Sequence, residues 1–343
     1  GVARANYPDI VEGIGNRISQ TLNTNTVKGK DIDGVSNDDI TDPSKINNIN
    51  FITKVIKIRD ATNSISAVYI KIQENDGGYE IVSAGTTDAT DNANNIYGGS
   101  LYIPNSVDGK SINKIDNNVF QKSNFSGELT LPRDLQYVGE NAFQSSVFTG
   151  KLVLPTEMWG VQNNAFQNSV FTGTLSLPTH LTIIGSYAFK SSVFTGKLSL
   201  PESTTIINEG SFLSSRFSGT LSLPNNLTMI GPYALINSNF SGNLIMPDTL
   251  NYFGGQIFNN SNFSGELHIS NNLENMYANN FSQNNQINSN FNKITGGDKL
   301  AKLIKIKESY ADDENDLSNS TGIFFNGNDL KTVSEINKIK STN

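Results

Sequence analysis

Hydrophobic residues recur through the middle of the chain in columns spaced 23 residues apart. Two leucine-rich columns stand on either side of one variable residue, and a proline column follows directly. Two phenylalanine columns and one isoleucine or valine column keep the same spacing. The first leucine column is Leu129, Leu152, Leu175, Leu198, Leu221, Leu244 and Leu267. The proline column is Pro132, Pro155, Pro178, Pro201, Pro224 and Pro247. This shared register identifies an internal repeat.

Each repeat contains segments with different patterns. The Leu-x-Leu segment alternates with period two, which predicts a short strand, and the following proline ends the strand because it cannot donate to the ladder. The isoleucine or valine column, which begins at Val138, is expected to point inward. The next column holds Gly139, Gly185, Gly231 and Gly254, with Asn208 in the same place, which predicts a left-handed turn. We expect the Ala-Phe segment that follows to form one turn of helix or 3-10 helix.

A single repeat of this length cannot bury its own apolar face, whereas stacked repeats can. The pattern therefore predicts a solenoid of about eight coils, whose strands pair in parallel with a rise of about 4.8 Å per coil. The phenylalanine columns should form a stacked aromatic spine. A serine column that begins at Ser123 and Ser146 should be buried with them. Its hydroxyls are expected to bond backbone groups in the turn, since the same residue in every coil cannot be one active site.

The repeats resemble the BspA-type leucine-rich repeats of bacterial and protist surface proteins. The resemblance rests on Leu-Ser-Leu-Pro-Asn-Asn-Leu-Thr-Met-Ile-Gly at 221–231 and on Ile-Ile-Gly-Ser-Tyr-Ala-Phe-Lys-Ser-Ser at 183–192. It covers about residues 98–285, and serine stands here where many members have cysteine. The resemblance implies a leucine-rich-repeat solenoid of α/β type, with mostly short parallel strands joined by turns or 3-10 helices. It also implies cell-surface location, adhesion and binding of host or matrix proteins, without naming a partner.

The two flanks lack the repeat register and are expected to cap the solenoid. Residues 1–97 predict an N-terminal capping subdomain, with a helix at 10–22 and strands near 51–58, 66–73 and 78–83. Residues 98–285 form the solenoid, and residues 286–343 a C-terminal cap or tail. The chain begins with Gly1 rather than Met, so we expect any targeting or anchoring segment to have been removed from it.

Composition, charge and the absence of known motifs argue against several classes of function. The net charge of −7 and the isoelectric point near 5.0 argue against nucleic acid as a partner. The absence of cysteine excludes disulfides and thiolate metal sites. No apolar run reaches the length of a transmembrane helix. No phosphate loop, dinucleotide fingerprint, nucleophile elbow or zinc-protease motif occurs, so we expect no enzyme activity and no cofactor.

The candidate binding site is the strand face, which we define as the positions flanking and between the leucines of Leu-x-Leu. Such faces bind proteins in many solenoids. Small Ser and Thr residues dominate here, so a plain solvated sheet is the alternative. The positions most suited to contacts are Glu128, Lys151, Val153, Lys197, Asn243, Ile245, Glu266 and His268.

Three other features of the sequence are candidate sites. His180 and His268 lie four coils apart, which rules out a shared site, and His180 is expected to be a plain exposed turn residue. Trp159 could be an exposed aromatic that stacks on a ligand. Two acidic clusters have oxygen-ligand spacing that could hold Ca²⁺, but neither matches the twelve-residue calcium loop, and ordinary solvated loops are the favoured explanation. The calcium candidates are Asp31, Asp33, Asp312, Glu314 and Asp316.

These observations favour a non-catalytic, adhesin-like binding protein, extracellular or on a cell surface. We expect a monomer that binds a host or matrix protein or glycan through the repeat surface. One alternative is a structural surface scaffold that self-associates. The other is a secreted effector or enzyme whose activity lies in a flank, although neither flank contains a histidine.

Overall fold

The computed structural model describes residues 53–58, 68–85, 99–123, 125–283, 286–287, 289–300, 302–304, 323–325 and 328–330. The chain divides into two compact units, Gly1–Phe171 and Thr172–Asn343. The helix predicted at residues 10–22 and the five calcium candidates lie outside the described residues. Among the residues described, no helix is long and apolar enough to cross a membrane.

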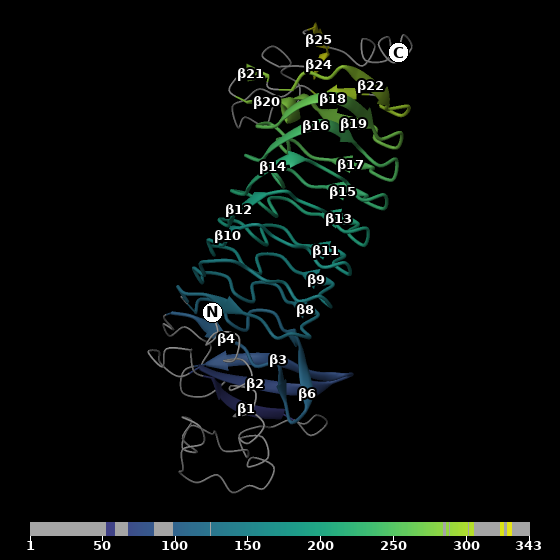
Figure 1. The fold of residues 1–343 in the computed structure, drawn as a ribbon. Helices are drawn as coiled ribbons and strands as arrows, with labels where there is room; N and C mark the ends of the chain where they lie inside the picture. Colours follow the sequence, from purple (N-terminus) through teal and green to yellow (C-terminus); the bar gives the residue numbers. More distant parts are fainter. Residues whose placement is uncertain are drawn as a thin grey trace, which may run out of the picture. The chain divides into compact units, whose positions relative to one another are not determined.

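The first unit begins with a three-stranded antiparallel meander. Its strands are β1 (Thr53–Ile58), β2 (Val68–Asn75) and β3 (Gly78–Gly85), close to where the sequence predicts strands. Strand β3 then pairs in parallel with β6 (Lys110–Ile115), the first strand of the repeats, and the four strands lie side by side in Figure 1. The meander therefore covers the open edge of the first coil, as a cap must.

Strand β6 starts a parallel sheet with one strand per coil. It pairs with β8 (Tyr137–Val138), which pairs with β9 (Gly160–Val161). The first coil also contains a hairpin of β5 (Ser106–Val107) and β6, whose turn residues Asp108 and Gly109 have φ values of 51° and 75°. Asp-Gly is suited to such a turn because both positions need positive φ. Strands β4 (Leu101–Tyr102) and β7 (Leu129–Thr130) pair in parallel.

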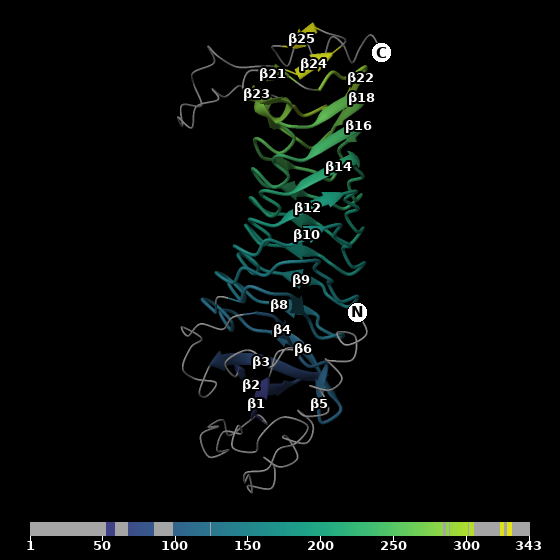
Figure 2. The same ribbon diagram turned by 60° about the vertical axis from the view of Figure 1, so that its left-hand side comes forward.

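The second unit holds two parallel sheets. One sheet consists of β11 (Ile183–Ile184), β13 (Ile206–Ile207), β15 (Met229–Ile230) and β17 (Tyr252–Phe253). The other, shown in Figure 2, consists of β10 (Thr172–Gly173), β12 (Val193–Gly196), β14 (Arg216–Thr220), β16 (Asn239–Ile245), β18 (Asn262–Ile269) and β22 (Lys293–Gly296). Short elements follow the repeats. They are β19 (Asn275–Tyr277), η3 (Ala278–Phe281), β20 (Ser282–Gln283), β21 (Gln286–Ile287), β23 (Lys302–Ile304), β24 (Ile323–Phe325) and β25 (Asn328–Leu330).

The strand predicted at Leu-x-Leu is only partly correct. Strand pairing reaches that segment in β4 and β7, at the ends of β16 and β18, and as a single parallel bridge between Ser199 and Ser222, but not at residues 152–154. The strand that recurs in every described coil instead ends at the isoleucine or valine column, which the sequence places inward and which is fully buried from Val138 to Ile230. Proline after Leu-x-Leu removes a ladder donor. In β18, where Ser270 replaces that proline, the strand runs for eight residues.

The left-handed turn predicted at Gly139 and its equivalents is wrong, because none of these glycines has a positive φ. Glycine instead permits a close approach of the preceding coil at Gly139, Gly231 and Gly254. A Cβ atom on Gly231 would lie 2.4 Å from the backbone nitrogen of Glu209 in the preceding coil. The left-handed residues lie two positions later, at Asn141 and its equivalents, and at the glycine of the Phe-x-Gly segment, as in Gly219 with a φ of 85°.

The Ala-Phe segment is a run of turns, not a helix. Local bonds link the backbone N–H of Ala142 to Gly139 and that of Gln144 to Asn141, at 3.3 Å and 3.1 Å. Between them, the N–H groups of Asn141 and Phe143 donate to carbonyl groups of the following coil. Alternate N–H groups thus bond within and between coils, so the wall stays hydrogen-bonded without the i−4 pattern of a helix.

Beside the buried aliphatic columns, the core contains aromatic stacks and a serine column, as the sequence predicts. Phe120 and Phe143 stack with centroids 5.1 Å apart, and in the second unit Phe189 and Phe212 stack at 5.3 Å. The serine column is fully buried from Ser123 to Ser261. Ser261 donates to the carbonyl oxygen of Ser238 at 2.9 Å and accepts the N–H of Phe240 at 3.1 Å. These hydroxyls therefore have a structural role.

Candidate functional site

In the first unit, the strand face presents exposed residues. Val153 is 67% exposed, which is the largest exposure among the large hydrophobic residues described. Lys151 is exposed and forms no ion pair with a described residue. Glu128 is half-buried and has a partner of its own. Lys151 and Val153 are thus free to contact another molecule.

In the second unit, the same face divides into exposed and internally bonded residues. Lys197 is exposed and has no ion-pair partner among the described residues, and Ile245 is 45% exposed. The side chain of Asn243 instead accepts the backbone N–H of Glu266 at 2.8 Å. Asn243 therefore has a structural task that its strand position alone did not reveal.

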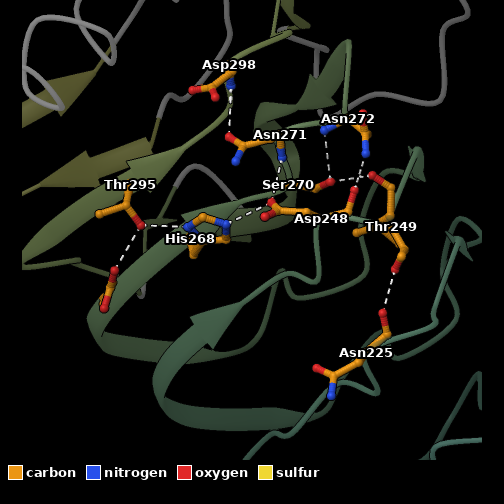
Figure 3. Close-up of polar contacts among 11 residues, drawn as sticks. Asn225, Asp248, Thr249, His268, Ser270, Asn271, Asn272, Thr295 and Asp298 are labelled. Carbon is orange, nitrogen blue, oxygen red and sulfur yellow. Dashed lines mark hydrogen bonds and ion pairs between the residues drawn. The ribbon is translucent and has the colours of Figure 1, made fainter.

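His268 joins a polar network between β18 and β22, drawn in Figure 3. Its Nδ1 lies 2.8 Å from Oγ1 of Thr295, and its Nε2 lies 3.0 Å from Oδ1 of Asp248. The hydroxyl of Thr295 donates to the carboxylate of Glu266 at 2.9 Å. These bonds fix the side chains of Glu266 and His268, two residues that the sequence offered as contact positions.

The network contains the residue types of a nucleophile–base–acid triad. Its hydrogen bonds, however, do not run in the directions that such a triad needs. The single hydrogen of the Thr295 hydroxyl is directed to Glu266, so the oxygen accepts from His268. His268 therefore does not act as a base towards Thr295. Nε2 of His268 faces the carboxylate of Asp248 on the other side of the ring. The network is a polar clamp between neighbouring coils.

The acidic end of the clamp also stabilises a turn. Asp248 accepts the backbone N–H of Asn271 at 2.9 Å. This bond, followed by the one from His268, lowers the pKa of Asp248 from its ordinary value of 3.8. The backbone carbonyl of Asp248 accepts the amide of Asn272, and Thr249 reaches back to Asn225 at 2.8 Å. Figure 3 shows these bonds crossing from coil to coil.

The other sheet of the first unit carries an aromatic cluster that the sequence showed only in part. Trp159 is 41% exposed, and its ring lies against that of Tyr137, with centroids 5.0 Å apart. The ammonium group of Lys114 lies 5.3 Å from the Tyr137 centroid. It is held by Asp116 at 3.2 Å and by Glu80 at 3.5 Å. Burial lowers the pKa of Lys114, but the attraction of these carboxylates outweighs it, so the pKa is raised.

In the second unit, an open groove of about 270 Å³ lies beside β17 and β19. Tyr252, which is 43% exposed, Tyr277 and Glu274 line it together with asparagine side chains. The repeat pattern gave no sign of this groove.

The remaining sequence candidates do not form a common site. His180 is exposed in a turn, as expected. The described parts of the chain contain no group of three or more histidine, cysteine, aspartate or glutamate side chains that could hold a metal ion. The acidic residues proposed for calcium lie outside those parts.

The model of the BspA type leucine-rich repeat region matches the chain in six copies, over residues 94–218 and 182–296. A search of the curated proteins found no match. Similar solved structures include a leucine-rich repeat protein from Bacteroides ovatus, with 17% identity, coverage of 68% of this chain and 69% of that chain, and a TM-score of 0.37. A leucine-rich cell surface protein from Faecalibacterium prausnitzii is 13% identical, with coverage of 83% of this chain and 98% of that chain and a TM-score of 0.27. The pneumococcal vaccine antigen PcpA is 14% identical, with coverage of 72% of this chain and 86% of that chain and a TM-score of 0.24.

Proposed function

Because the chain belongs to the family of BspA-type leucine-rich repeat regions, we propose that it is a non-catalytic surface protein that binds a protein partner through its strand face. Repeats of this type occur typically in surface proteins, and stacked repeats commonly serve as interaction modules. The aromatic spine and the serine column occupy the interior with structural contacts. Contact with a partner therefore falls to the outward positions.

One observation carries this proposal. On the strand face of the second unit, the side chains of Lys197 and Ile245 are exposed, and Lys197 has no ion-pair partner among the described residues. In the first unit the same is true of Lys151 and Val153. An exposed branched apolar side chain gains free energy when a partner covers it, and an unpaired lysine can find a carboxylate there. Strand residues with internal bonds, such as Asn243, instead keep the face rigid.

Binding is tested with the double variant Lys197→Glu, Ile245→Asp against immobilised extracellular matrix proteins and mucins. The unaltered protein should bind one of them saturably, and the double variant should bind at least about tenfold more weakly. The matched control is Glu157→Lys, Tyr252→Asp, which makes the same kinds of change at exposed residues away from the strand face. Equal loss in both variants, or none in either, would place the binding surface elsewhere.

Surface location is tested on intact cells that produce the protein. Antibody against the chain should label these cells without permeabilisation, and external protease should remove the label. Labelling that requires permeabilisation would overturn the surface assignment.

A further inference from the structure

The coil that contains β9 departs from the repeat at three neighbouring positions. Trp159 stands where the other coils have Gln136, Thr182, Thr205 or Thr228. Gly160 stands where they have a large residue such as Tyr137 or Ile183. Gln162 stands in the glycine and asparagine column. Three residues that lie together on the surface thus depart from the repeat in a single coil. Folding of the coil does not require them, because neighbouring coils fold with other residues at the same positions.

The three changes create an exposed aromatic surface. Without a side chain at Gly160, the ring of Tyr137 can lie over that position, because a Cβ atom there would be only 3.1 Å from the ring. Trp159 then packs on Tyr137 with an interplanar angle of 39° and remains 41% exposed. The rings come from neighbouring coils, whose strands β8 and β9 pair in parallel.

Uncommitted hydrogen-bonding groups surround the rings. The indole N–H of Trp159 and the side-chain amides of Gln136 and Gln162 form no hydrogen bond with the residues that the structure describes. The amide nitrogen of Gln162 lies 3.9 Å from the position of a Cβ on Gly160, beside the bare backbone. Glu80, Lys114 and Asp116 close one side and together carry one net negative charge.

We propose that Trp159, Tyr137, Gln136 and Gln162 form a binding site for a neutral glycan. The C–H face of a pyranose ring packs on exposed aromatic rings, and its hydroxyl groups match the free amides and the indole N–H. The local negative charge disfavours acidic sugars. This site lies on a different sheet from the strand face, so it does not depend on the protein-binding proposal.

Trp159 is the only tryptophan of the chain, so its fluorescence reports on this site directly. The probes are cellotetraose and tetra-N-acetylchitotetraose, with tetragalacturonate as the acidic comparison and tetralysine as a cationic one. A neutral tetrasaccharide should shift Trp159 emission saturably, with a dissociation constant of about 1 mM or tighter. Tetragalacturonate should not. Emission that neither neutral tetrasaccharide changes, or that only tetralysine changes, would overturn the proposal.

Two variants restore residues that the repeat itself uses, so the coil should still fold. Trp159→Thr, measured by calorimetry, should weaken glycan binding about tenfold or more. Gln162→Gly, measured by fluorescence, should weaken it about fivefold. Tyr252→Ala removes an exposed tyrosine of the second unit and should leave the affinity unchanged. Full glycan binding by Trp159→Thr, with an unchanged melting temperature, would also overturn the proposal.

Discussion

At the scale of single residues, the repeated columns provide particular backbone contacts between neighbouring coils. Ser261 donates to the carbonyl oxygen of the preceding coil and accepts an N–H from it, and its side chain is fully buried. The hydroxyl of Ser261 therefore satisfies two buried backbone groups, and those of Ser169 and Ser238 do the same in their coils, whereas the hydroxyl of Ser146 has no hydrogen-bond partner among the described residues. Gly231 acts differently, since its missing Cβ allows the backbone of the preceding coil to approach. The repeated columns indicate that a particular residue type is needed at a position. They do not indicate whether it is needed for a hydrogen bond or for the close approach of two backbones.

Replacing Ser261 by alanine should lower the free energy of unfolding by about 1–3 kcal/mol, because two buried backbone groups lose their partner. Ser261→Cys should cost less, since a thiol is a weak donor and acceptor of similar shape. Chemical denaturation measures both. The control is Ser241→Ala on the exposed side of β16, which should change the midpoint little. A midpoint for Ser261→Ala equal to that of the control would remove the column's energetic role.

At the scale of elements, short strands are joined by side-chain clamps. Strands β18 and β22 pair over four residues, and the bonds among Glu266, Thr295 and His268 reinforce that pairing. Asp248 ties the same clamp to the turn of the next coil. The sequence predicted Glu266 and His268 as ligand contacts, because it shows that a residue points outward but not that a neighbouring coil offers it a partner.

The lowered pKa of Asp248 predicts how stability depends on pH. A carboxyl group with a depressed folded pKa stabilises the protein above its unfolded pKa, and this contribution is lost as the pH falls through the folded value. The melting temperature of the unaltered protein should therefore exceed that of Asp248→Asn at about pH 6, and the difference should shrink towards about pH 3. For the exposed Glu157→Gln, the difference should be small at both values. A gap for Asp248→Asn that stays constant with pH would contradict this account.

At the scale of the whole molecule, a stack of coils needs protected ends. Strand β3 hydrogen-bonds to β6 and so occupies the edge of the first coil. The parallel partner comes from an antiparallel meander whose inner residues, including Ile70, Ile72 and Ile81, are fully buried. An unprotected edge would present free backbone groups to other chains. The predicted boundaries, 1–97, 98–285 and 286–343, stay predictions.

A chain that starts at residue 99 lacks β1–β3 and should self-associate through the exposed edge of β6. Light scattering should show a mass that rises with concentration, and the melting temperature should fall. A chain that starts at residue 53 keeps the meander and serves as the control. If the shorter chain remains monomeric with an unchanged melting temperature, the meander is not needed as a cap.

The sequence by itself determined the repeat, its inward columns, the stacked rings and the buried serines, because each depends on a pattern that a 23-residue period makes visible. It also placed Lys151, Lys197, Val153 and Ile245 on an outward face, and the capping strands near their observed positions. Only the tertiary structure decided which segment forms the recurring strand, because pairing depends on where the backbones of adjacent coils can approach. It alone showed that His268 is clamped and that Tyr137 lies beside Trp159, because those contacts join side chains from different coils.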